Sequence, residues 1–166
     1  MRVLGIDPGL ERIGFGVVEK CGSKLAAVEF GLVKTPRIEI GARLQFIYGE
    51  IEALFGRTKP DCVATERLFF SKNQTTAIDV AKALGVVQLC AAQHGLACRE
   101  YSPPEVKLSV VGNGAAEKDQ VAYMVVRLLG LNEAPKPDDV ADALAVALTH
   151  ALRANATTAQ TANSPL

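Results

Sequence analysis

The sequence lacks any long apolar segment. No apolar run comes near the roughly 20 residues that a membrane-spanning helix needs. The apolar residues near the amino terminus are interrupted by Asp7 and Pro8, well short of the core of a signal peptide. Export and contact with a membrane are therefore not expected. We expect a cytoplasmic protein whose thiols stay reduced.

The sequence also has few cysteine and histidine residues that could bind a metal, and it has no net charge. The four cysteines form no Cys-x-x-Cys pair and there are only two histidines, which disfavours a zinc site or a thiol redox centre. Eighteen Lys and Arg residues balance 18 Asp and Glu residues, which excludes a protein that coats nucleic acid by bulk basicity. The chain has no P-loop, Gly-x-Gly-x-x-Gly loop or Gly-x-Ser-x-Gly nucleophile motif.

The patterns that are present fit one compact domain in a chain of 166 residues. Period-two alternation predicts an antiparallel meander of three strands, at about 2–7, 12–19 and 24–34. A helical stripe over 44–55, a strand at 62–66, a helix at 75–93 and a strand near 97–101 follow. Three helices end the pattern, the first after a capping box at 102–105, the second over 121–129 and the third from Asp138.

The order βββαβαβααα predicts an α/β fold, with a mixed five-stranded sheet and helices on both faces. We assign residues 1–154 to this domain. The uncharged segment 155–166 has too little large apolar surface to offset its ordering entropy, so we predict a disordered tail there. Helix 75–93 is apolar nearly all round, which indicates a second buried face, interpreted here as a dimer contact.

Two acids stand at the ends of predicted strands. Asp7 ends the first strand within Gly-Ile-Asp-Pro-Gly, and Glu66 ends the fourth within Val-Ala-Thr-Glu. If these strands are parallel neighbours about 4.8 Å apart, the two carboxylates share one edge of the sheet, where like charges need a cation or a proton between them. The alternative is that each acid merely caps a strand or starts a turn.

Three more acids open the last helix. Asp138 suits the N-cap, with its side chain on the amide of Ala141, while Asp139 and Asp142 at i and i+3 project from one face. Acids in a first turn also complement the helix dipole without any catalytic role. Against that simpler interpretation, the rest of the helix is almost wholly apolar, so Asp142 projects from a buried element and needs a partner.

Convergence of these acids would create a site made of oxygen ligands only. Such a site selects Mg²⁺ or Mn²⁺ over Zn²⁺. Two ions about 3.5 to 4 Å apart can clamp a phosphodiester for hydrolysis. The sequence therefore predicts hydrolysis of a nucleic-acid backbone.

Four segments together resemble the RuvC-type Holliday-junction resolvases, in order and in spacing over about residues 1–152. They are Gly5-Ile6-Asp7-Pro8-Gly9, Glu66 with Phe69 after it, residues 106–118, and Asp139-Val140-Ala141-Asp142-Ala143-Leu144 followed by residues 148–150. One motif alone is weak, because Gly-Ile-Asp-x-Gly also opens actin-like ATPases. The set of four is specific.

The resemblance implies an RNase H-like fold, a homodimer and symmetric nicking of two opposed strands at a four-way DNA junction. It further implies 5′-phosphate and 3′-hydroxyl ends, a place in homologous recombination and DNA repair, and cooperation with the RuvA and RuvB branch-migration machinery. Two Mg²⁺ ions per site are implied, with Mn²⁺ as a substitute. The implied metal ligands and catalytic residues are Asp7, Glu66, Asp139 and Asp142.

The resemblance also assigns DNA contacts. Lys107 and Lys118 would contact phosphates near the scissile bond, and Phe69 would stack on or wedge an unpaired base at the crossover, a contact of about 1 to 3 kcal/mol. The family commonly has Gln after the strand-end Glu, whereas Arg67 stands here. We expect Arg67 to contact phosphate or to serve a surface role, because neighbouring strand residues point to opposite sides.

Three alternatives remain beside this assignment. One is another RNase H-like nuclease that acts on RNA or on RNA–DNA hybrids. A second is a non-catalytic binding module, whose signature would be the loss of an acid, and none is lost. The third is an actin-like ATPase, which needs two such domains and a second phosphate loop that 166 residues do not supply.

Overall fold

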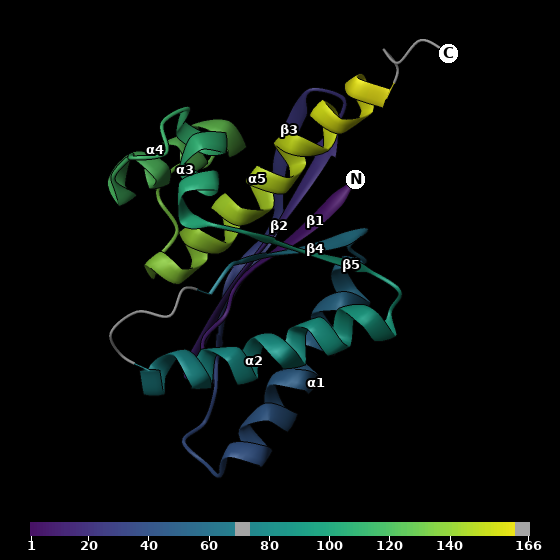
Figure 1. The fold of residues 1–166 in the computed structure, drawn as a ribbon, viewed down its shortest axis with the longest axis vertical. Helices are drawn as coiled ribbons and strands as arrows, with labels where there is room; N and C mark the ends of the chain where they lie inside the picture. The colour runs from purple at the N-terminus through teal and green to yellow at the C-terminus, as the bar shows by residue number, and fades with distance from the viewer. Residues whose placement is uncertain (69–73, 162–166) are drawn as a thin grey trace.

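The computed structural model describes residues 1–68 and 74–161, with the backbone alone at 74–76 and 155–161. Its five strands are β1 (Arg2–Asp7), β2 (Arg12–Cys21), β3 (Lys24–Lys34), β4 (Cys62–Glu66) and β5 (Ala97–Tyr101). Its helices are α1 (Ile40–Thr58), α2 (Gln74–Gln93), α3 (Pro103–Val111), α4 (Lys118–Leu129) and α5 (Asp138–Thr161). The predicted order βββαβαβααα is confirmed (Figure 1).

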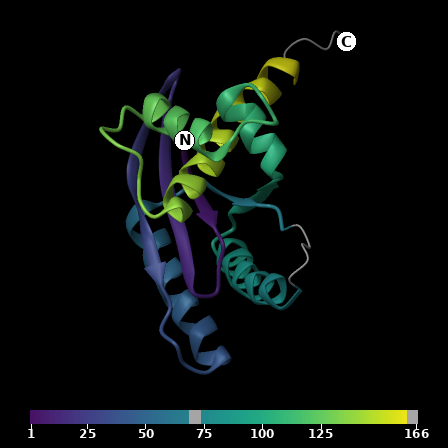
Figure 2. The same ribbon diagram turned by 90° about the vertical axis from the view of Figure 1, so that its left-hand side faces the viewer.

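The strands form one mixed sheet in the order β3-β2-β1-β4-β5. The first three strands are an antiparallel meander, and β4 and β5 add parallel to β1. Helices α1 and α2 lie on one face of this sheet, and α5 crosses the other face with α3 and α4 beside it (Figures 1 and 2). The predicted mixed sheet with helices on both faces is thus confirmed.

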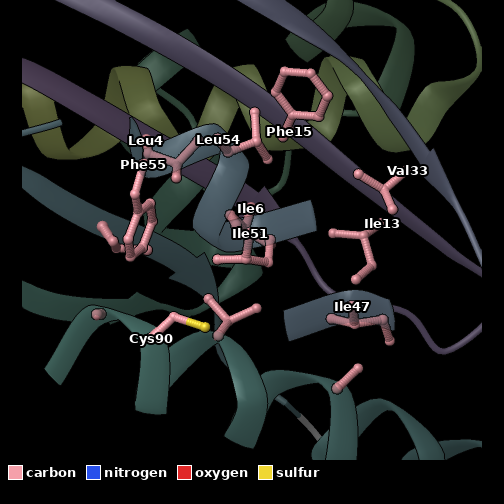
Figure 3. Packing of buried hydrophobic residues seen from close by; sticks show 14 of the residues in the cluster. Leu4, Ile6, Ile13, Phe15, Val33, Ile47, Ile51, Leu54, Phe55 and Cys90 are labelled. Atoms are coloured by element: carbon pink, nitrogen blue, oxygen red, sulfur yellow. The ribbon is translucent and has the colours of Figure 1, made fainter. Parts of the chain in front are cut away.

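Alternation along the strands separates two cores. Leu4 and Ile6 of β1 point toward α1 and α2, where they meet Ile47 and Ile51 of α1 and Cys90 of α2 (Figure 3). The opposite side of the same strands packs against α3, α4 and α5, through Val3, Val18, Ala64, Leu144 and Leu148 among others. Because side chains alternate with period two, Gly5 and Asp7 share the α5 side with Val3.

Small residues let α5 lie directly on the sheet. A Cβ atom on Gly5 would overlap the carbonyl oxygen of Ala143, and one on Gly14 would overlap the carbonyl oxygen of Asp139. Any side chain at either strand position would lift the helix away. The glycines of β1 and β2 therefore set how closely the start of α5 approaches the end of β1.

Several predicted boundaries differ from the structure. The stripe at 44–55 is the middle of a longer α1, because the Glu39 side chain accepts from the amides of Gly41 and Ala42 and so begins the helix earlier. Asp138 is the first residue of α5, so Pro137, not Asp138, holds the position before the helix, and the predicted N-cap was wrong by one residue.

The carboxyl end of α5 bears on the predicted tail. The helix continues to Thr161, beyond residue 154, where we placed the end of the domain. The division into a domain of residues 1–154 and a tail of residues 155–166 stays a prediction. Within the described part of the chain, no helix has the length and apolar character needed to span a membrane.

Candidate active site

Asp7 and Glu66 lie next to each other at one edge of the sheet. Strands β1 and β4 are parallel, and Ile6 is in register with Thr65, the residues just before the two acids. Both acids fall on the α5 side, Asp7 by alternation with Gly5, and Glu66 by alternation with Ala64, which packs in the α5 core. The condition set in the sequence analysis, that these two strands are parallel neighbours, is therefore met.

Helix α5 brings Asp139 and Asp142 to the same place. The two acids are three residues apart, so they share a face of the helix. Its first turn rests on Gly14, the residue of β2 in register with Asp7. Both side chains are partly buried, with exposed fractions of 24% and 28%. Four acids, one from each of two strands and two from one helix, therefore converge at the end of β1.

This convergence changes how readily the strand acids ionise. Burial, together with the negative charges of Asp142, Glu66 and Asp139, raises the pKa of Asp7 from 3.8 to about 7. Burial, followed by the charge of Asp142, also raises the pKa of Glu66. The site thus holds more negative charge than its surroundings stabilise, which is the condition that a bound cation relieves.

Three basic side chains offset part of this charge. Nζ of Lys118 donates to Oδ2 of Asp142 at 2.8 Å, and this hydrogen bond raises the pKa of Lys118. The positive charges of Lys118 and Lys107 offset part of the rise in the pKa of Glu66. Nη2 of Arg12 lies 3.6 Å from Oδ2 of Asp139.

The acids border hollows large enough for a ligand. One of about 320 Å³ is lined by both strand acids and by Lys107, Lys118 and Asp142. A second, of about 800 Å³, lies over the start of α5 and extends from Asp7 to Arg12. Carboxylates and ammonium groups thus face common open space.

The carboxylates fit a divalent ion chemically but do not form a finished cage. Across residues 1–68 and 74–161, no three Asp, Glu, His or Cys side chains are grouped closely enough to hold one ion. Asp142 and Asp139 face Lys118 and Arg12 instead. The donors are nevertheless all carboxylate oxygens around a partly buried Asp7 that its acidic neighbours repel, which suits Mg²⁺ or Mn²⁺.

The remaining predicted residues lie at the margin of the site. Arg67 follows β4, is exposed, and lines a hollow of about 230 Å³ together with Asp7 and Glu66. Its amide donates to the carbonyl of Tyr101, which fixes the backbone beside Glu66. Phe69, predicted to stack on a base, lies outside the described residues.

Sequence analysis missed Arg12. Alternation places Arg12 on the same side of β2 as Gly14, but it does not show which helix covers that side. The two histidines have other partners: Nε2 of His94 lies 2.9 Å from Glu52, and Nδ1 of His150 lies 2.7 Å from the Tyr101 hydroxyl.

The sheet order, the meander followed by two parallel strands, and acids that converge from β1, β4 and α5 define an RNase H-like fold with a nuclease-type acidic site. A family model described as crossover junction endodeoxyribonuclease RuvC matches residues 3–150. The chain belongs to the RuvC family.

Individual relatives cover nearly the whole chain. The crossover junction endodeoxyribonuclease RuvC of Desulfitobacterium hafniense is 50% identical over 156 residues, 93% of this chain and 94% of the relative. That of Heliobacterium modesticaldum is 51% identical over 149 residues, 89% and 92% of the two chains. A solved structure titled as Thermus thermophilus RuvC in complex with Holliday junction substrate matches with a TM-score of 0.90 and 41% identity, over 95% of this chain and 97% of that one.

Proposed function

We propose that this protein is a metal-dependent endonuclease that resolves four-way DNA junctions by paired, symmetric nicks. The observation that carries the proposal is the partly buried carboxylate of Asp7, surrounded by Glu66, Asp139 and Asp142 and bordered by lysines. The family adds the substrate, since relatives bear the name crossover junction endodeoxyribonuclease and one was solved with a Holliday junction.

Each acid has a role in this proposal. Asp7, Glu66, Asp139 and Asp142 would hold two divalent ions, Mg²⁺ by preference and Mn²⁺ as a substitute. Two such ions supply a nucleophile from water at neutral pH and stabilise the charge on the leaving oxygen. Hydrolysis then leaves 5′-phosphate and 3′-hydroxyl ends that a ligase can seal, as homologous recombination and DNA repair require.

The basic residues would hold the DNA backbone. Lys107 and Lys118 line the same hollow as the acids, so their ammonium groups can contact the phosphates on either side of the reacting bond. Arg67 would contact a phosphate at the far side of Asp7 and Glu66. Phe69 would stack on an unpaired base at the crossover.

Paired nicks call for two copies of the site. Ile78 and Leu89 of α2 are each 53% exposed in the single chain, and we propose that this face of α2 forms a homodimer contact. We further propose that the dimer acts in the cytoplasm with RuvA and RuvB on migrating junctions.

The test is a cleavage assay with the ends mapped on all four strands. A four-way junction should be nicked symmetrically with Mg²⁺, and linear duplex and an RNA–DNA hybrid should be poor substrates. Asp7→Asn should abolish cleavage and keep junction binding, because it removes charge from the metal site and leaves the DNA surface unchanged. Preference for the hybrid, or full cleavage by Asp7→Asn, would contradict the proposal.

A further inference from the structure

Arg12 is placed by the same packing that positions Asp139. It begins β2, and Arg12, Gly14 and Gly16 follow one another on the α5 side of that strand. Gly14 lies against the carbonyl of Asp139. The guanidinium of Arg12 therefore reaches the carboxylate of Asp139, with 3.6 Å between Nη2 and Oδ2.

Both of the site acids that α5 contributes face a basic side chain. Asp142 faces Lys118 from α4, and Asp139 faces Arg12 from β2. A divalent ion that approaches either carboxylate meets a positive charge already there, and two cations on one carboxylate repel each other. Each basic residue must therefore move, or weaken the binding of the ion.

Arg12 has open space on either side into which it can move. Its side chain is 56% exposed, whereas that of Asp139 is 24% exposed. It lines the hollow of about 800 Å³ over the start of α5 together with Lys118 and Lys136, and a neighbouring one of about 440 Å³ together with Arg43. Arg43 donates through Nη2 to the carbonyl of Leu10 at 2.9 Å, which holds the turn between Asp7 and Arg12.

We propose that Arg12 holds the Asp139 carboxylate while no metal ion is bound, and turns to a backbone phosphate of the junction once that carboxylate binds metal. This inference rests on the proposed function, since it takes Asp139 as a metal ligand. It makes Arg12 a positioning residue for Asp139 and a further DNA contact. Lys118 serves Asp142 in the corresponding way.

The first measurement is Mn²⁺ binding to the DNA-free protein by calorimetry. Arg12→Gln should bind Mn²⁺ roughly two- to fivefold more tightly than the wild type, as expected for loss of one competing exposed ion pair. Arg37→Gln is the matched control, because Arg37 is 88% exposed and makes a similar contact at 4.0 Å with Glu11, which is not one of the four site acids. Equal or weaker Mn²⁺ binding by Arg12→Gln, relative to Arg37→Gln, would overturn the proposal.

The second measurement is binding of a fluorescent four-way junction in the presence of Ca²⁺ over a range of salt concentrations. Loss of one phosphate contact should lower the slope of log affinity against log salt by about 1 in Arg12→Gln. Arg12→Lys, which keeps the charge, should restore the slope. An unchanged slope in Arg12→Gln would overturn the DNA half of the proposal.

These results separate the inference from the proposed function. Mn²⁺ binding without DNA tests Arg12 whatever the substrate is. Failure of the wild-type protein to cut junctions would contradict the proposed function and leave the Arg12–Asp139 competition measurable.

Discussion

Lys118 and Asp142 form a hydrogen bond of 2.8 Å that joins the first residue of α4 to the first turns of α5. The positive charge of the same ammonium group offsets part of the rise in the pKa of Asp7 and of Glu66. One lysine therefore acts on three of the four acids, and its loss should change more than DNA affinity.

Lys118→Ala should lower the single-turnover rate of junction cleavage by about 100-fold, the scale seen when one preorganised charge-stabilising group is removed. A shift of the pH–rate profile toward alkaline pH is the more specific result. Without Lys118 the acids need a higher pH to ionise, so the rising limb should move to higher pH. Lys24→Ala, an exposed lysine at the start of β3, should change neither. A slower variant with an unchanged profile would limit Lys118 to phosphate contact.

Asp7→Asn should stabilise the metal-free protein. Because the pKa of Asp7 is about 7 in the folded state and 3.8 otherwise, the folded protein binds more protons between those values, and its stability falls as the pH rises through that window. Asn does not ionise, so the variant does not lose this stability. Its gain in free energy of unfolding over the wild type should grow from pH 4 to pH 7, level off above pH 7, and reach roughly 1 to 3 kcal/mol.

Urea unfolding in EDTA at pH 4, 6 and 8 measures this gain, with the exposed Asp119→Asn as the control. Added Mg²⁺ should reverse the order, because the wild-type site gains an ion that the variant binds poorly. A gain in stability that is the same at all three pH values would show that the folded protein does not raise the pKa of Asp7.

Much of this arrangement follows from local pattern. Alternation with period two fixes which side of each strand carries Asp7 and Glu66, and spacing by three fixes the shared face of Asp139 and Asp142. Such features depend on residues close in sequence, so the sequence alone could predict them. The parallel pairing of β1 with β4 was only a condition in the sequence analysis, and the structure supplies it.

Other features depend on contacts between distant segments. The pairing of Arg12 with Asp139 arises only when Gly14 lets α5 rest on β2, and alternation says nothing about which helix will cover a strand. The start of α1 was missed because the Glu39 cap lies outside the apolar stripe that reveals the helix. The sides of the sheet and helix that carry the acids were therefore more predictable than helix ends or ion pairs.

The glycine contact gives a prediction about geometry. Gly14→Ala places a methyl group against the Asp139 carbonyl, so the first turn of α5 must shift, at a cost of about 1 to 3 kcal/mol for overpacking. Cleavage at a temperature where the variant is fully folded should fall at least tenfold, because Asp139 moves with the backbone. Gly49→Ala in α1, where nothing lies within 4 Å of the added Cβ atom, should instead stabilise by about 0.5 to 1 kcal/mol. Full activity of folded Gly14→Ala would mean that the site tolerates displacement of α5.

The exposed face of α2 gives a prediction about assembly. Leu89 is 53% exposed in the single chain and lies on the same helix as Ile78, which is equally exposed. Burial of both in a dimer would be favourable, whereas a charge placed there would have to be desolvated. Leu89→Glu should therefore convert a dimeric mass to a monomeric one in light scattering and abolish paired nicks.

Leu108→Glu is the matched control for mass, since Leu108 is also 53% exposed but belongs to α3 on the opposite side of the sheet. It should leave the dimer intact. Residual single nicks by Leu89→Glu would fit a complete site in each chain, because the described acids all come from one copy. A wild-type protein that is monomeric at working concentration, or a Leu89→Glu variant that stays dimeric, would exclude this face of α2 as the contact.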